Sequence, residues 1–288
     1  TRAMGNFQQR YPCCLERDVL GRSLRRGPRG SRLESDEQRY NEAAAKEDVH
    51  GLVALMKSNA AYTVADDAEP HSWAESPQSI GSLAASRLAV IIAHAESEQD
   101  AKRLRDEVRD AGGITELTSI LRHADEPTDR VHCALVALSF LSVDSEENCR
   151  QMHKDHLLAS LVPLLASPIP GLRTTALTTA ANIFKLSPRI RSEFVDRGGL
   201  TALIQHLEIA PNKRDTSNFD AELETVYTLS DLIEGDEPET TNSKVAEQAL
   251  REGVIPRLAS MAEGCSDSDL KHEIEELLRR LRSSASVA

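Results

Sequence analysis

Residues 172–207 read LRTTALTTAANIFKLSPRIRSEFVDRGGLTALIQHL, and the helical pattern of the chain is clearest here. Leu172 to Leu186 shows a helical period with one apolar face. Ser187-Pro188 then begins a second helix, because serine is a good N-cap and proline is tolerated at the first helical position. Gly198-Gly199 permits a left-handed turn, and Leu200 to Leu207 supplies a third helix. The stretch therefore predicts three consecutive, closely connected helices.

The same pattern recurs along the chain at a fixed step. Gly112-Gly113, Asp155-His156 and Gly198-Gly199 each lie 43 residues apart. Asp and His are acceptable replacements for glycine because they are enriched among the residues that adopt a positive φ. A further unit follows at Gly253, at a step of 55, which implies about 12 extra residues in its loops. The periodicity predicts a stack of helical repeats.

The repeats divide the chain into a short arm and a long helical body. About four repeats, from residue 80 onward, are expected in an all-α, right-handed α-solenoid that spans residues 36–288 with a helical cap at each end. Leu164 and Leu207 occupy equivalent positions in two of the repeats, so both are expected to be buried. Residues 1–35 show neither a helical nor a strand period and are expected to form a flexible basic arm.

The net charge of −12 is divided unevenly between these parts. Residues 1–33 hold eight arginines against two acidic residues, so they carry +6 and the remainder carries −18. An acidic body is a poor nucleic-acid binder, because phosphate neutralisation needs a clustered basic face. No run of 18 apolar residues occurs, so no transmembrane helix is predicted. Five cysteines without a disulfide or metal-knuckle pattern favour a reducing, cytoplasmic environment.

Signals for catalysis or metal binding are weak. Cys149, His153 and His156 could share one side of a helix, but no fourth ligand of fitting spacing follows them. His132-Cys133 has no recognisable acid partner that would complete a nucleophile and base pair. The glycine pairs are explained by helix ends, not by a phosphate-binding loop. We therefore expect no enzyme activity, no cofactor and no metal.

The residues around Asn182 resemble an armadillo repeat. Thr179–Phe184, followed by Ser187–Arg191 and Phe194–Leu200, is similar to the end of the family's long third helix and the start of its next unit. The resemblance covers roughly residues 80–283. It implies an armadillo-type solenoid that works as a non-catalytic protein-binding scaffold, and it supports the fold more firmly than the function.

The resemblance also implies a binding groove. In armadillo proteins, asparagines of successive third helices line the concave face and hold an extended peptide by its backbone. The matched positions here are Ile91, Phe140, Asn182 and Asp231, and the tryptophans of the nuclear-import members are missing, with Tyr227 at one of their positions. The expected partner-binding groove consists of Phe140, Asn182, Tyr227 and Asp231. The alternative is that Phe140 and Tyr227 are partly buried packing residues.

The arm carries a second resemblance. Met4-Gly5-Asn6 and Cys13-Cys14, among arginines, are similar to the amino terminus of acylated armadillo-repeats-only membrane adaptors. This implies a myristoyl group on Gly5 once Met4 is removed, and palmitoyl groups on Cys13 and Cys14. One fatty chain binds membranes only marginally, so a second chain or a basic patch is needed. Three residues precede Met4, and the sixth position of the myristoylation motif is neither serine nor threonine.

Three functions therefore remain open. The first is an adaptor, tethered to the cytoplasmic side of a membrane by the acylated arm, that recruits a protein partner through its solenoid. The second is a structural accessory subunit of a large organellar complex, with the arm buried against neighbours, because an arginine-rich start without methionine also fits a processed transit sequence. The third is an exchange factor for Hsp70, since such factors also use acidic armadillo solenoids.

Overall fold

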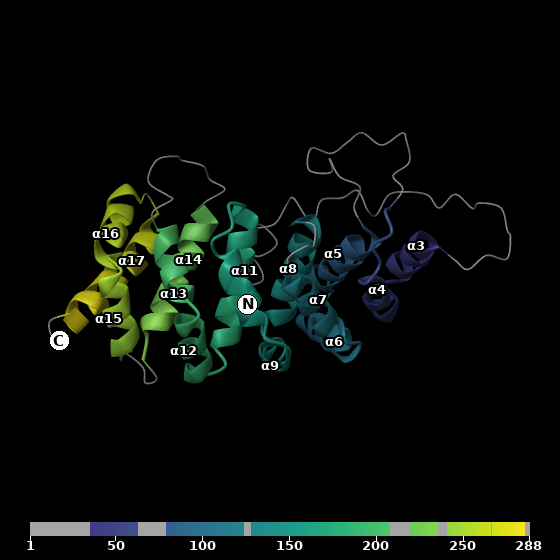
Figure 1. Ribbon diagram of the computed structural model, residues 1–288, viewed down its shortest axis with the longest axis horizontal. Coiled ribbons are helices and arrows are strands. Elements are labelled where there is room, and N and C mark those ends of the chain that lie inside the picture. The colour runs from purple at the N-terminus through teal and green to yellow at the C-terminus, as the bar shows by residue number, and fades with distance from the viewer. Residues whose placement is uncertain are drawn as a thin grey trace. The chain divides into compact units, whose positions relative to one another are not determined.

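The computed structural model describes residues 35–62, 79–123, 128–207, 219–235, 241–265 and 267–285. Within these residues the chain forms fifteen α-helices and no β-strand, with isolated bridges at Ala61–Ser79 and Glu234–Thr241. Figure 1 shows the helices in chain order by colour. The predicted all-α class is confirmed. No helix in the described part is both long and apolar enough to cross a membrane.

The chain divides into two compact units, of which the first ends at Leu141. Its described helices form two consecutive sets of three. These are α3 (Asp36–Lys46), α4 (Val49–Leu55) and α5 (Ile80–Ala93), then α6 (Glu98–Asp110), α7 (Gly113–Arg122) and α8 (Thr128–Ser142), the last of which ends at the boundary. Within this unit α4 packs against α3, α5 and α6. Arg130 of α8 donates to the carbonyl oxygen of Met56 at 3.0 Å, which ties the second set to the first.

The second unit begins at Ser142 and contains three further sets. They are α9 (Glu146–Lys154), α10 (Leu157–Leu164) and α11 (Pro170–Phe184); α12 (Pro188–Asp196), α13 (Gly199–His206) and α14 (Phe219–Ile233); and α15 (Ser243–Arg251), α16 (Val254–Gly264) and α17 (Ser268–Ala285). The long third helices pack in sequence, α11 against α14 and α14 against α17. This row of third helices positions the candidate site described below.

The segments predicted as terminal caps belong to complete sets. Helices α3 and α4 join α5 in the first set, and α17 is the third helix of the last set. The described residues therefore hold five three-helix sets, where the sequence indicated about four repeats with caps. The first set was harder to recognise because the connection from α4 to α5, between residues 55 and 80, is long and breaks the 43-residue step.

Helix ends follow the predicted capping residues. The side chain of Ser187 accepts a hydrogen bond from the amide of Ile190 at 3.4 Å, and Pro188 is the first residue of α12. Residues with a left-handed backbone precede the second helix of four sets: Gly112, His156, Gly198 and Gly253, with φ between 60° and 87°. Glycine is favoured there because it adopts positive φ without steric cost.

The 43-residue alignment of the repeats differs from the structure by one residue at the Asp155-His156 pair. His156 takes the left-handed conformation, whereas Asp155 has φ −79°. Helix α10 therefore starts one position later than the alignment predicts, and the face that it buries is displaced by one residue. Leu165 is fully buried while Leu164 is only half-buried, so the prediction for Leu164 was wrong. Leu207 is 6% exposed, as predicted.

The second glycine of each pair has a different role from the first. A Cβ atom on Gly199 would lie 2.5 Å from the ring of Phe194, and a Cβ on Gly113 would lie 2.6 Å from Val108. Real Cβ contacts of that length do not occur in close-packed interiors. The missing side chain allows α13 and α7 to approach the helix that precedes each of them.

Candidate functional site

Helix α11 is tightly packed along most of its length, and Asn182 is one of its partly exposed residues. Its buried residues are largely alanine and threonine, and the hydroxyls of Thr175 and Thr179 donate to the carbonyls four residues earlier at 2.7 Å each. These bonds satisfy polar groups that would be costly to bury unpaired. Asn182 is half-buried, and its Nδ2 donates to Oγ of Ser142 at 3.0 Å. This bond anchors the carboxamide through its nitrogen.

Helix α14, which packs against α11, presents Tyr227 and Asp231. Tyr227 is 41% exposed, and only Ile169 is comparably exposed among the large hydrophobic side chains that the structure describes. Asp231 lies four residues later, on the same face of the helix. Its Oδ2 lies 3.5 Å from Nζ of Lys185, which follows α11 directly. We call Asn182, Lys185, Tyr227 and Asp231 the α11–α14 surface.

The charges on this surface are only partly solvated. Burial raises the pKa of the Asp231 carboxyl, and the nearby Lys185 opposes that rise. Arg191 of α12 donates to the carbonyl oxygens of Asp231 and Glu234, at 3.3 and 3.4 Å, and so neutralises the carboxyl-terminal end of α14. A carboxylate in such a setting gains more from a cationic partner than a fully exposed one does.

Two of the four matched positions lie elsewhere. Phe140 is on α8, in the first unit, and is 5% exposed, and Ile91 on α5 is 4% exposed. Phe140 was expected in the groove, but its ring is covered by packing and is not available to a partner. This corrects the groove prediction for Phe140 in favour of the packing interpretation. The acylation sites Gly5, Cys13 and Cys14 lie outside the described residues.

The residues considered for catalysis and metal binding have other contacts. The Cys149 thiol donates to the carbonyl of Ser142 at 3.3 Å, and burial raises its pKa to about 12. Burial also raises the pKa of Cys133 to about 12, so that neither thiol is a thiolate at neutral pH. Nε2 of His153 lies 2.9 Å from a carboxylate oxygen of Glu193. In the described ranges, no three His, Cys, Asp or Glu side chains converge as metal ligands.

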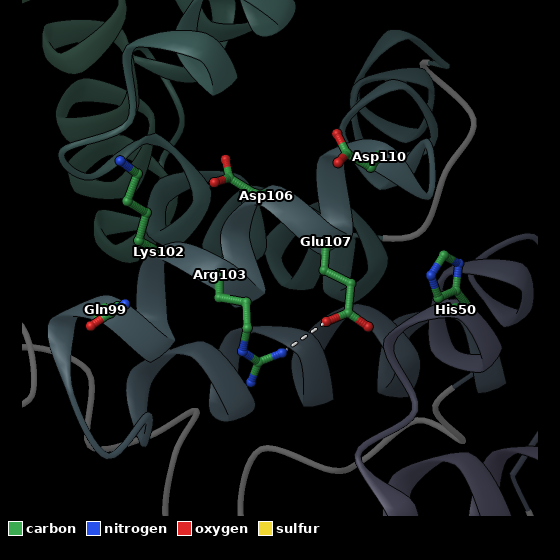
Figure 2. A pocket seen from close by; sticks show the side chains of 7 residues that line it. All are labelled: His50, Gln99, Lys102, Arg103, Asp106, Glu107 and Asp110. Atoms are coloured by element: carbon green, nitrogen blue, oxygen red, sulfur yellow. Dashed lines mark hydrogen bonds and ion pairs between the residues drawn. The ribbon is translucent and has the colours of Figure 1, made fainter.

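A hollow of about 510 Å³ lies in the first unit, between α4 and α6 (Figure 2). Its lining residues are His50, Gln99, Lys102, Arg103, Asp106, Glu107 and Asp110. Several of these charges are already paired along α6: Arg103 with Glu107 at 3.1 Å, and Arg109 with Asp106 at 2.6 Å. The groups do not converge on one point, and we assign no ligand to this hollow.

Sequence reasoning missed Lys185, which belongs to the α11–α14 surface, and Ser142, which accepts a hydrogen bond from Asn182. Lys185 lies three residues after Asn182, so helical spacing could have placed it on the same side of α11. Ser142 lies 40 residues before Asn182, close to one repeat length. The bond between Arg191 and the Glu234 carbonyl spans 43 residues, and the Arg87 bond to the Ala44 carbonyl also spans 43. A spacing of about one repeat between a polar side chain and its partner, which is a side chain or a backbone carbonyl, therefore recurs in these contacts.

No protein-family model and no curated protein matches the chain. Among solved structures, the chain is similar to ARO, the armadillo repeats only protein from Plasmodium falciparum, with 32% identity and a TM-score of 0.73, over 87% of this chain and 99% of that chain. It is also similar to a designed armadillo repeat protein in complex with peptide (KR)4, with 15% identity and a TM-score of 0.59, over 85% of this chain and 86% of that one.

A third similar structure is that of computationally designed armadillo repeat proteins for modular peptide recognition, with 15% identity and a TM-score of 0.60, over 85% of this chain and 90% of that chain. Identities this low establish the fold alone. Together with the helix sets described above, they confirm the armadillo-type α-solenoid as the fold class. The match to ARO is closer and covers nearly all of that protein. The chain therefore belongs to the family of armadillo-repeat proteins that includes ARO.

Proposed function

We propose that the protein is a non-catalytic adaptor that recruits a protein partner through the α11–α14 surface. The observation that carries this proposal is the exposed ring of Tyr227, one turn before Asp231 on the same helix. Exposed aromatic rings beside hydrogen-bonding groups are enriched at the centres of protein interfaces. Designed armadillo repeat proteins for modular peptide recognition, which share this fold, support the same function.

The surface favours a partner segment that carries a basic side chain next to an apolar one. A lysine or arginine of the partner would replace Lys185 beside Asp231, and the Tyr227 ring would cover the adjoining apolar group. Asn182 retains its carbonyl oxygen as an acceptor for a backbone amide. The peptide (KR)4 in one of the similar designed proteins is an example of a basic ligand on this fold.

A direct binding measurement tests the proposal. We expect a fluorescently labelled peptide of alternating lysine and arginine to bind the full chain, and Asp231→Asn to weaken binding about tenfold, or about 1.4 kcal/mol, because one charge-assisted contact is lost. Tyr227→Ala should weaken binding of peptides that add an apolar residue. Lys102→Ala, an exposed change in the first unit, is the matched control and should leave the affinity unchanged.

Recruitment in the cell extract of origin provides a second test. The partner is captured by cross-linking the full chain in that extract. The double variant Asn182→Ala with Asp231→Ala should no longer capture this partner, and its helical circular dichroism should be unchanged. If binding of the partner persists in the double variant but is lost when residues 1–33 are deleted, the arm is the binding surface and the α11–α14 proposal fails.

We also propose that the arm tethers the adaptor to a membrane surface through acyl groups on Gly5, Cys13 and Cys14. The basis is the motif in the sequence, together with the eight arginines that would add attraction to anionic lipid. Intact mass of the protein from its own cells should show a myristoyl group on Gly5, and Gly5→Ala should abolish flotation with vesicles. An unmodified chain starting at Thr1 would instead support the structural-subunit alternative.

A further inference from the structure

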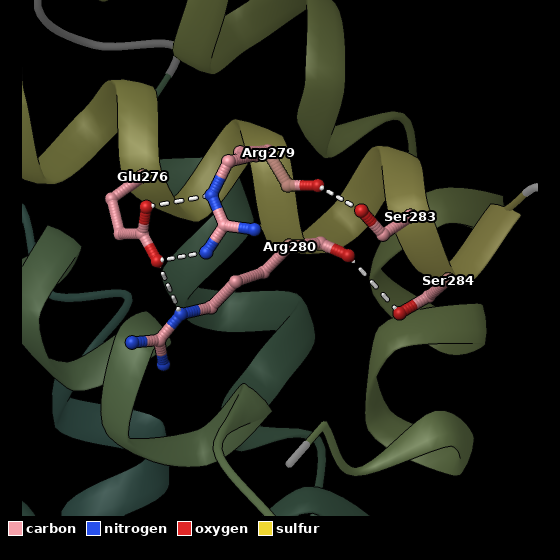
Figure 3. A network of polar contacts seen from close by, with 5 residues as sticks. All are labelled: Glu276, Arg279, Arg280, Ser283 and Ser284. Atoms are coloured by element: carbon pink, nitrogen blue, oxygen red, sulfur yellow. Dashed lines mark hydrogen bonds and ion pairs between the residues drawn. The ribbon is translucent and has the colours of Figure 1, made fainter. Parts of the chain in front are cut away.

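The last two turns of α17 combine arginines with serine hydroxyls (Figure 3). Arg279, Arg280 and Arg282 come directly before Ser283 and Ser284. The Ser283 hydroxyl donates to the carbonyl of Arg279 at 3.0 Å, and the Ser284 hydroxyl donates to that of Arg280 at 3.1 Å. Each hydroxyl therefore lies one helical turn beyond an arginine. Ser283 is exposed and Ser284 is half-buried.

Two of these arginines contact the carboxylate of Glu276. Nε of Arg279 and Nε of Arg280 donate to the two oxygens of one carboxylate, that of Glu276, at 2.8 and 3.1 Å. Hydrogen bonds from Arg279 and then Arg280 hold the pKa of Glu276 at about 2, so this group is a carboxylate at neutral pH. The exposed Arg282 follows these two arginines by three and two residues. Three arginines therefore lie within four residues of an exposed serine near the end of α17.

We propose that Ser283 is the phosphorylation site of a serine kinase that selects basic substrates, and that its phosphate is held by Arg279 and Arg280. Kinases of this class recognise their substrates by charge, with acidic residues that bind arginines on the amino-terminal side of the serine. Ser283 has arginines one, three and four residues before it. For Ser284 the nearest arginine is two residues earlier, and the residue three before it is the buried Leu281.

The reaction uses MgATP as co-substrate. A bond forms between Oγ of Ser283 and the γ-phosphorus, the bond from that phosphorus to the oxygen of ADP breaks, and the hydroxyl proton passes to the kinase's catalytic carboxylate. The product carries nearly two negative charges and three acceptor oxygens. Side chains three and four residues apart are neighbours on a helix, so the phosphate comes within reach of the guanidinium groups of Arg280 and Arg279.

A phosphate on Ser283 needs neighbouring arginines because of its place near the end of α17. A negative charge near the carboxyl-terminal end of a helix is opposed by the helix dipole. The phosphate is compatible with the last turn of α17 only if arginines neutralise it, and it then competes with Glu276 for them. Access by the kinase requires the last turn to open. Helix termini are the segments that open most easily, although the buried Leu281 resists opening here.

The test uses the full chain with MgATP and the catalytic subunit of a basophilic kinase, and the modified residue is identified by mass spectrometry. We expect phosphate on Ser283, at least tenfold less phosphate within residues 268–288 of Ser283→Ala, and unchanged labelling of Ser283 in Ser284→Ala. Arg280→Gln should slow the labelling of Ser283 at least tenfold. Labelling confined to Ser284, or equal labelling of this segment in Ser283→Ala, overturns the site.

Capture of the phosphate is measured separately by phosphorus NMR. The second pKa of the phosphate should be lower in the folded protein than in the same protein unfolded in urea, because the arginines favour the dianion. A second pKa that is equal in the folded and unfolded chains overturns the capture by Arg279 and Arg280.

Discussion

The one-residue displacement of α10 predicts that two adjacent leucines respond differently to truncation. Leu165 is fully buried and Leu164 is half-buried. Leu165→Ala removes apolar burial and leaves a cavity between α10 and its neighbours, which together cost about 2–5 kcal/mol of unfolding free energy. Leu164→Ala removes only part of a burial energy of about 1.5–3 kcal/mol, and solvent fills the space that it leaves. We expect Leu165→Ala to be the more destabilising by at least about 1 kcal/mol.

The assay compares the two variants with the unchanged chain in urea. The midpoint and slope of the transition give the unfolding free energy. Because the chain has two compact units, hydrogen exchange of the α10 and α11 amides reports the unit that carries the change. Leu207→Ala is the matched control, because it tests a buried leucine in a set where the predicted alignment holds.

A reversed order of the two stability losses would contradict the displacement of α10. If Leu164→Ala costs as much as Leu165→Ala or more, the side chain at position 164 is the buried one. The 43-residue alignment would then be restored, and the left-handed conformation would belong to Asp155 and not to His156. Equal and small losses for both variants would mean that α10 packs loosely and contributes little to the second unit.

Three further predictions follow from single contacts. Gly199→Ala should destabilise the protein by about 1–3 kcal/mol because its Cβ would overlap the Phe194 ring, whereas Gly264→Ala, with no atom within 4 Å, should be neutral or slightly stabilising, as thermal unfolding would show. Glu276 has a folded pKa of about 2, below its ordinary 4.5, so its contribution is present above pH 4.5 and lost as the pH falls toward 2. Solvent screening limits that contribution to about 1 kcal/mol, and Glu276→Gln should remove this part of the acid dependence of stability. Cys149, with its pKa raised to about 12, should resist alkylation at pH 8 in the folded protein and react on unfolding, as peptide mass mapping would show.

Much of the fold could be predicted because local chemistry and repeat spacing agree. Ser187-Pro188 marked the start of α12, and Gly198 marked the turn before α13, since capping and positive φ depend on neighbouring residues in the chain. The first set was only partly recognised. Its long connection removes the constant step on which repeat detection depends.

Less of the candidate site could be predicted. The sequence alignment grouped Phe140 with Asn182 and Asp231, but equivalent positions in repeats need not be equally exposed, and Phe140 is covered. Lys185 was not expected, because its contact with Asp231 depends on how the end of α11 lies beside α14. Sequence reasoning therefore placed residues of one helix, such as Tyr227 and Asp231, better than it placed contacts between two helices.

Local sequence patterns specify the fold class: helices of a regular length, turns that need glycine and a repeat of about 43 residues. These properties depend on backbone conformation and on the period of apolar side chains, both of which are local. The tertiary structure alone decided which residue of the Asp155-His156 pair takes positive φ, and hence that Leu165 is buried in place of Leu164. It also decided that Tyr227 stays exposed while Phe140 is covered. The burial of a side chain depends on which side chains of the neighbouring helix cover it, and a repeat pattern does not specify those contacts.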